Sequence, residues 1–121
     1  MNYGCCRDNN EIPMITIEGD MGGDPIWCTN CGCNLDIDKI PLGKELKVAL
    51  WQWMHNYGKW IDWETDTLLP NATEQERLHN KKGQKLTWNV QQALNGEYIV
   101  TFKPSTSVEL YTEIARFDMN E

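Results

Sequence analysis

The stretch KELKVALWQWMHNY, residues 44–57, carries the clearest secondary-structure signal in the chain. Its apolar side chains recur at intervals of three and four residues, which places them on one face of an α-helix. These side chains are Leu46, Ala49, Leu50, Trp53, Met54 and Tyr57. Gly58 follows directly and is a typical helix stop. We therefore expect a helix over residues 44–57 that packs its apolar face on the rest of the protein.

A second helix is predicted downstream of the first. Thr73 and Glu76 have the spacing of a capping box, which marks a helix start. The helix would run to residue 94, where Asn95-Gly96 closes it, and Gly83 would break or kink it. Its apolar stripe consists of Leu78, Leu86, Val90 and Leu94. Leu86, Val90 and Leu94 should pack on the first helix and build the core with Leu46, Leu50, Trp53 and Tyr57.

The C-terminal part of the chain adds a strand and one ambiguous segment. Residues 97–103, EYIVTFK, alternate and are rich in β-branched and aromatic side chains, so they predict a strand. Residues 107–117 fit a helix with one apolar face or a strand that pairs back on residues 97–103. The rest of the core is expected to come from this strand.

The N-terminal part of the chain predicts a β-hairpin. Residues 14–18, MITIE, alternate and are β-branched, and residues 25–27 form a second short strand after a turn-rich connection. We expect an α+β fold in which a zinc-knuckle hairpin precedes two main helices packed on a small sheet. Residues 1–40 would form the hairpin module and residues 41–121 the α+β body, together one compact domain.

Five cysteines, three of them in CTNCGC, suggest a metal site. Cys28 and Cys31 have the C-x-x-C spacing that directs two thiolates to one ion, and Gly32 permits the backbone twist this turn needs. Zinc takes four ligands, so the other two must come from another turn. Cys5 and Cys6 lie upstream, across the predicted hairpin. The sequence therefore predicts a structural zinc held by these four cysteines.

In the motif WCTNCGCNL, and over residues 3–35, the chain resembles the zinc ribbon family. The resemblance implies a structural zinc at the end of a hairpin. The chain departs from the family because its first knuckle is a pair of adjacent cysteines, whose side chains usually project apart. Cys33 is therefore a rival fourth ligand, as are His55 and His79. Ordinary reduced cysteines are the alternative, and a thioredoxin-like redox pair is disfavoured because no βαβ unit surrounds the motif.

The charge distribution limits the partners that the chain could bind. The net charge is −7, and residues 1–38 carry seven carboxylates against one Arg. Phosphate backbones attract Lys and Arg, so we expect no nucleic-acid binding and favour a basic protein partner. The basic residues cluster in one place, at Arg77, Lys81, Lys82 and Lys85. The sequence contains no apolar run of membrane-spanning length and starts without a signal-peptide pattern, so a cytoplasmic location is expected.

One line of side chains on the first helix is a candidate for partner binding. Trp51, His55 and Val48 lie about 100° from the line through Leu50 and Trp53. They are either covered inside the fold or left for a partner, in which case Trp51 and His55 would form the contact surface.

Two further features have simpler interpretations. Residues 60–67, WIDWETDT, are expected to be a solvated acidic loop with buried tryptophan rings, and His79 is expected on a solvated helix face.

The sequence thus favours a small acidic intracellular protein with a structural zinc that acts as a protein-binding or regulatory module. An immunity- or antitoxin-like role would fit its size and charge. The alternative is a small metal-dependent or cysteine-based enzyme that uses an open zinc position. A nucleic-acid-binding zinc ribbon is the third class, disfavoured by charge.

Overall fold

Three α-helices, a four-stranded sheet and a two-stranded sheet make up the described part of the chain. The computed structural model describes residues 12–119, and only the backbone of residues 115–119. The elements are β1 (Met14–Ile17), β2 (Ile26–Cys28), β3 (Asn34–Leu35), the 3-10 helix η1 (Ile37–Lys39), α1 (Lys44–His55), β4 (Ile61–Asp62), β5 (Thr67–Leu68), α2 (Ala72–Leu94), β6 (Ile99–Phe102) and α3 (Ser107–Met119). The predicted α+β class is confirmed, and the ambiguous C-terminal segment is a helix.

The main sheet joins strands from the two ends of the described chain. Its strand order is β3-β2-β1-β6. The predicted N-terminal hairpin is present, with β1 and β2 antiparallel and Thr16 opposite Trp27. β6 lies parallel to β1 and pairs Thr16 with Thr101. The sequence predicted a strand near residues 97–103 but not its position beside β1.

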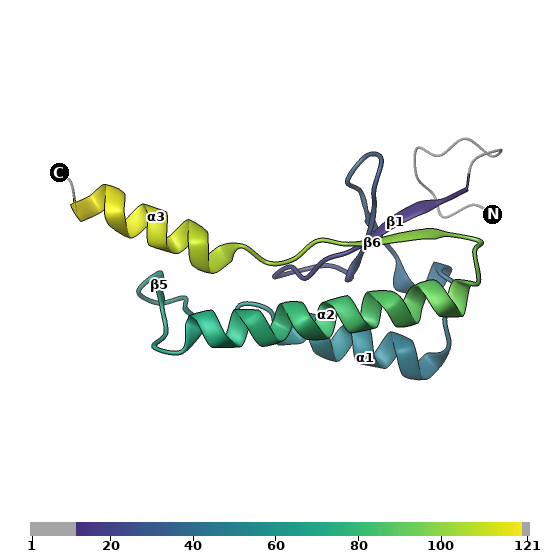
Figure 1. Cartoon of the computed structure of the whole chain (residues 1–121), viewed down its shortest axis with the longest axis horizontal. Helices are drawn as coiled ribbons and strands as arrows, with labels where there is room; N and C mark the ends of the chain where they lie inside the picture. The colour runs from purple at the N-terminus through teal and green to yellow at the C-terminus, as the bar shows by residue number, and fades with distance from the viewer. Residues whose placement is uncertain (1–11, 120–121) are drawn as a thin grey trace.

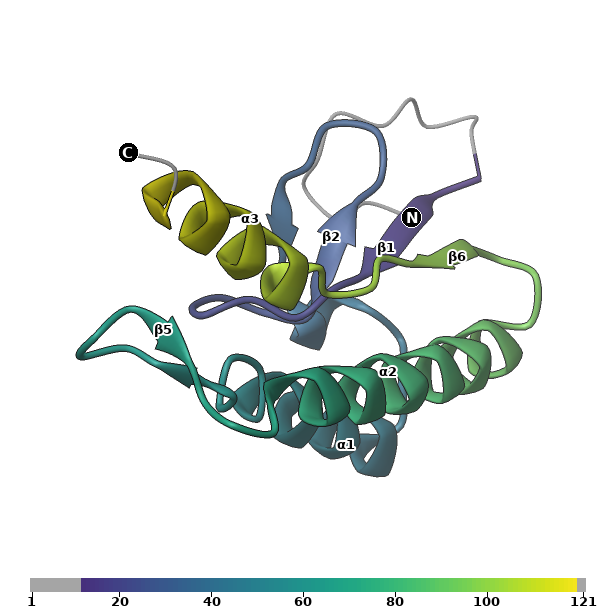
Figure 2. The same ribbon diagram turned by 60° about the vertical axis from the view of Figure 1, so that its left-hand side comes forward.

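The two long helices form a layer beneath one face of this sheet (Figures 1 and 2). Alternate strand residues, such as Ile15, Ile17 and Ile26, are fully buried between the sheet and the helices. Leu50 and Trp53 from α1 and Leu86, Val90 and Leu94 from α2 complete this core, together with Tyr98. Most of the predicted core is therefore confirmed, whereas Leu78, which the sequence placed on the apolar stripe of the second helix, has a side chain that is 51% exposed.

Gly83 lies in the middle of α2 and does not interrupt it. The helix is continuous from Ala72 to Leu94, so the predicted break is wrong. A Cβ atom at Gly83 would lie 2.5 Å from Phe102 Cε1 and 2.6 Å from Trp53 Cζ2. The glycine is therefore required by close packing: the rings of a strand residue and an α1 residue both rest directly on the α2 backbone.

The start of α2 differs from the predicted capping box. Asn71 is the N-cap residue and makes no side-chain cap bond. Glu76 instead reaches the first turn of α3, where its Oε2 accepts hydrogen bonds from Val108 N at 3.1 Å and from the Ser107 hydroxyl at 2.8 Å. A carboxylate suits this position because the first backbone amides of a helix lack partners within the helix. Glu76 thus fastens α3 beside β5, beyond the end of the main sheet (Figure 1).

Candidate functional site

The outer face of the main sheet, on the side away from α1 and α2, carries a mixed aromatic and polar surface. Side chains alternate along each strand, so the residues between the buried isoleucines point outward. Thr16, Trp27 and Thr101 share this face on three neighbouring strands because the register places them in one row. No helix or strand among residues 12–119 covers this row (Figures 1 and 2).

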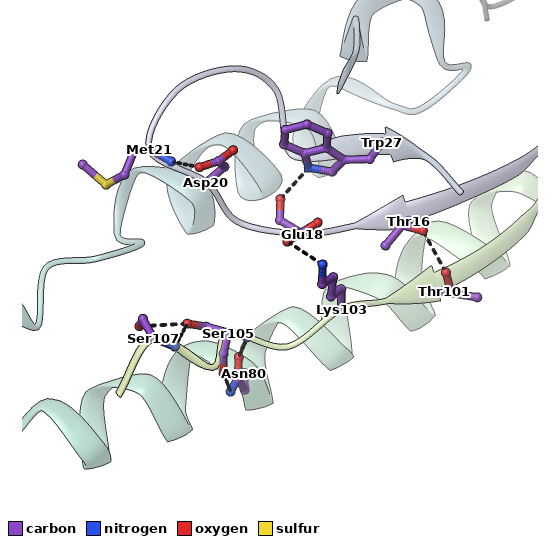
Figure 3. Close-up of polar contacts among 10 residues, drawn as sticks. All are labelled: Thr16, Glu18, Asp20, Met21, Trp27, Asn80, Thr101, Lys103, Ser105 and Ser107. Atoms are coloured by element: carbon purple, nitrogen blue, oxygen red, sulfur yellow. Dashed lines mark hydrogen bonds and ion pairs between the residues drawn. The ribbon is translucent and has the colours of Figure 1, made fainter. Parts of the chain in front are cut away.

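Hydrogen bonds hold the row in a defined arrangement. Thr16 Oγ1 lies 2.8 Å from Thr29 Oγ1 and 3.1 Å from Thr101 Oγ1, so the three hydroxyl groups cross the sheet as a ladder. The Trp27 indole Nε1 donates to the backbone carbonyl of Glu18 at 3.1 Å (Figure 3). This bond fixes the ring orientation and leaves the ring half-buried. A preoriented indole loses little conformational freedom when a partner covers it.

A hollow of about 370 Å³ opens on this face, and we call it the outer-face hollow. It is lined by Thr16, Glu18, Asp20, Trp27, Cys28, Thr29, Gly32 and Lys103. Glu18 Oε2 lies 3.6 Å from Lys103 Nζ, and Asp20 Oδ1 accepts a hydrogen bond from Met21 N at 2.7 Å (Figure 3). Two carboxylates and one amine therefore line a hollow that also offers hydroxyl groups and an indole ring. Such a surface can receive a cationic side chain and pack its aliphatic part on the indole.

The cysteine motif forms the tight turn that the sequence predicted, between β2 and β3. Cys28 N donates to Cys33 O and Gly32 N donates to Cys28 O, both at 2.8 Å, and Gly32 has a φ of 77°. The three cysteines of the motif differ in burial. Cys28 is 1% exposed within the core, whereas Cys31 is exposed and places its Sγ 3.2 Å from Cys33 Sγ.

The predicted metal ligands are only partly described. Cys5 and Cys6 lie outside the described residues. Within residues 12–119, no group of three or more Cys, His, Asp or Glu side chains is placed to hold a metal ion. The zinc ligand set is thus a prediction that these residues leave untested, and elemental analysis of the purified protein tests it.

His79 lies in an aromatic box in the interior, so its predicted place on a solvated face is wrong. The side chain is 8% exposed, and its ring stacks on Trp53 with the centroids 4.5 Å apart. Tyr57 and Trp60 close the box at 5.7 and 5.3 Å. Burial lowers the pKa of His79 to about 4 even though Glu76 opposes the shift, so the imidazole is neutral at physiological pH. Its Nδ1 has no hydrogen-bond partner among the described groups.

Trp51 and His55 lie on the side of α1 that faces the β1–β2 connection. The Trp51 ring is half-buried against the core and lies 5.5 Å from the His55 ring, which is exposed. Both residues line a hollow of about 240 Å³ that Asp20 and Met21 also border. Their role in partner binding stays a prediction.

The acidic loop fits its prediction in part. Trp60 is buried and its Nε1 donates to Ser107 Oγ at 2.9 Å, whereas Trp63 is half exposed, so the expectation that both rings are buried is wrong for Trp63.

Sequence reasoning missed the outer face of the sheet. The signal was present, because Thr16 lies between two buried isoleucines and Trp27 lies between Ile26 and Cys28. The sequence did not indicate that Thr101 and Lys103 belong to this face, because they reach it only through the parallel pairing of β6 with β1.

The fold and the outer face together define a small α+β protein with a polar and aromatic surface on one open sheet face. The chain belongs to the family described as Serratia CdiI immunity protein-like, whose family model matches residues 13–105. A comparison with curated proteins found no match. The resemblance to zinc ribbons is therefore wrong: the matched family is a different one, and it covers the hairpin and the helical body together. Among the described residues, no helix is long and apolar enough to cross a membrane.

Proposed function

We propose that this chain is an immunity protein that neutralises a protein toxin by binding it, and that the outer face of the sheet contacts the toxin. The family to which the chain belongs supports the immunity role. The observation that carries the choice of surface is the half-buried Trp27, held by Glu18 beside the outer-face hollow with no described element over it.

The outer face has the composition of a protein contact. Trp is among the residues that contribute most to binding energy when a partner removes it from water. The threonine hydroxyl groups around it can donate or accept hydrogen bonds, so they can satisfy the polar backbone of a partner. The outer face lies on a hydrogen-bonded sheet, and interface backbones usually move little on binding, so this contact would need little rearrangement.

The charge of the chain favours a basic toxin. The net charge of −7 attracts a positively charged partner over a distance of about one Debye length and raises the association rate. At close range, Glu18 and Asp20 outnumber Lys103 in the outer-face hollow, so a Lys or Arg of the toxin would find a carboxylate there. We also propose that the protein acts in the cytoplasm, as its sequence predicts, and cell fractionation tests this location.

Binding to a purified toxin domain encoded beside this chain tests the proposal. Trp27→Ala should weaken binding at least about tenfold, as loss of a central aromatic contact does. Asp20→Lys should weaken it more at low salt than at high salt, because it reverses an exposed charge facing the toxin.

Trp63→Ala is the matched control, since it removes a half-exposed tryptophan from the acidic loop and should leave affinity unchanged. Thermal unfolding of each variant separates lost contacts from lost fold. Equal affinities for Trp27→Ala, Asp20→Lys and the control would exclude the outer face. Failure of the wild-type chain to bind or neutralise the toxin would exclude the immunity role for that toxin.

A further inference from the structure

β6 is an edge strand of the main sheet, and one of its sides faces away from β1. The amides of Ile99 and Lys103 donate to β1-side carbonyls, those of Pro13 and Ile17, at 2.9 and 3.0 Å. Backbone groups alternate between the two sides of a strand, so Val100 and Phe102 direct their amides and carbonyls to the outer edge. Exposed edges of this kind can pair with another chain.

α2 satisfies this outer edge at its two ends with side-chain amides. Gln91 Nε2 donates to the Tyr98 carbonyl at 2.8 Å, and its Oε1 accepts from Val100 N at 3.0 Å. Asn80 Oδ1 accepts from Ser105 N at 2.8 Å, and its Nδ2 donates to the Ser105 carbonyl at 3.1 Å (Figure 3). Each side-chain amide therefore makes the two hydrogen bonds, one donated and one accepted, that the backbone of one residue in a neighbouring strand would make.

Between these two amides, part of the edge has no partner among residues 12–119. No hydrogen bond joins the Phe102 amide or carbonyl to another group within the described residues 12–119. Gln84 lies on the same stripe of α2 as Asn80 and Gln91, but it is exposed and makes no such bond to β6 in the described structure. On this edge the described residues therefore provide no hydrogen-bond partner for the Phe102 backbone.

This part of the edge opens into a groove of about 630 Å³ between α2 and β6, which we call the edge groove. It is lined by Arg77, Asn80, Lys81, Gln84, Thr101, Phe102 and Pro104. Glu74 engages Arg77 through two hydrogen bonds at 2.6 and 3.0 Å, whereas Lys81 makes no salt bridge with a described carboxylate. The charged lining is therefore positive, in contrast to the net charge of the chain. Figures 1 and 2 both show β6 running along α2 at this place.

We propose that the edge groove binds an extended acidic segment of the partner protein, which pairs its backbone with Phe102 and directs a carboxylate to Lys81. Backbone pairing at a sheet edge gives affinity, and side chains beside the edge give specificity. A second copy of this chain would bring a second set of the same positive charges to the groove, so charge disfavours self-association there. The partner's identity rests on the proposed immunity function, and a toxin with net positive charge can still present one acidic strand.

Two measurements on the complex with the toxin test this pairing. Amide hydrogen exchange followed by NMR should show that exchange at Phe102 slows at least about tenfold in the complex. Lys81→Glu should weaken toxin binding about tenfold, whereas Lys85→Glu should change it less than about threefold. Lys85 is the matched control because it is an exposed lysine one turn further along α2 that does not line the edge groove.

A toxin that binds while Phe102 exchanges as fast as before, or while the two lysine variants behave alike, overturns the edge groove and leaves the immunity role intact. A toxin that does not bind at all counts against the immunity role. The proposal for the edge groove is then tested with the capped peptide acetyl-EVEVE-amide. Titration of this peptide to millimolar concentration should perturb and protect the Phe102 amide, and no change there overturns the inference. A dimer of the purified chain with Phe102 protected would show that a second copy occupies the groove and would overturn it too.

Discussion

Replacing Gly83 with Ala should destabilise the protein, although the same change in most helices is favourable. The residue has ordinary helical geometry, so intrinsic propensity alone predicts that alanine adds about 1 kcal/mol of stability. The packing predicts the reverse. The added methyl group would lie 2.5 and 2.7 Å from two carbons of the Phe102 ring and 2.6 Å from one carbon of the Trp53 ring.

The magnitude follows from how far the rings must move. Carbon atoms rest about 3.5–4.0 Å apart at optimal separation, so both rings would have to retreat by about 1 Å. Trp53 is fully buried and donates its Nε1 hydrogen bond to the His79 carbonyl at 2.9 Å, so it cannot retreat without disturbing that bond. Overpacking of this kind costs about 3 kcal/mol at the upper end of its usual range. After the gain in helix propensity, we expect a net loss of about 2 kcal/mol.

Urea unfolding followed by circular dichroism measures this loss. Gly22→Ala is the control, because no atom lies within 4 Å of its added Cβ, and it should change stability by less than about 0.5 kcal/mol. Adding Phe102→Leu to Gly83→Ala should recover part of the loss, since it removes the ring atoms nearest to the new methyl group. A Gly83→Ala variant as stable as the wild type, or more stable, would refute the packing argument.

Three further perturbations have defined outcomes. Acidification from pH 7 to 4 should lower the free energy of unfolding by about 3 kcal/mol through His79 alone, because the pKa of its imidazole is 6.5 in the unfolded chain and about 4 in the folded protein. This contribution is complete above pH 6.5 and is lost as the pH falls towards 4. His79→Phe should lose this part of the pH dependence, and equal pH profiles of the two proteins would contradict the prediction. Glu76→Gln should cost about 1–2 kcal/mol and speed amide exchange in α3 but not in the main sheet, because the carboxylate accepts three hydrogen bonds at the start of α3; unchanged exchange in α3 would argue against this anchor. Trp51→Ala, measured for stability and toxin affinity together, should weaken binding without unfolding the chain if α1 joins the contact, and a loss of stability alone would remove Trp51 from the site.

The sequence predicted those parts of the fold that depend on local periodicity. Alternation in residues 14–18 predicted β1, and the spacing of Leu50 and Trp53 predicted α1 and its buried face. Long-range pairing could not be obtained in this way, because nothing local to β6 specifies β1 as its neighbour. The capping box failed for a related reason: Glu76 is used by α3, whose N-terminus is distant in sequence but adjacent in space.

The candidate site was harder to predict than the fold. The cysteine motif predicted the turn between β2 and β3, which forms as expected. The outer face could not be predicted in this way, because it depends on which side of the sheet the helices cover. His79 could have been predicted in the core, since it shares a stripe of α2 with Gly83, Leu86 and Val90. A histidine and a glycine do not count as apolar residues, however, so this half of the stripe was not recognised. The two amides that bond to the outer edge of β6 give no sequence signal, because Asn and Gln are common on solvated helix faces.

The parallel pairing of β1 with β6 also affects the time at which the protein becomes folded. Thr16 and Thr101 are hydrogen-bonded across a separation of 85 residues. Strand β1 therefore acquires its second neighbour, β6, only after both long helices have been synthesised. Contacts between distant segments form late and slow the folding of a domain. During synthesis, β1 would expose an unpaired edge until β6 emerges, and such edges are prone to aggregation. We therefore expect a nascent chain that ends before residue 98 to be protease-sensitive, with protection arising abruptly once β6 is available.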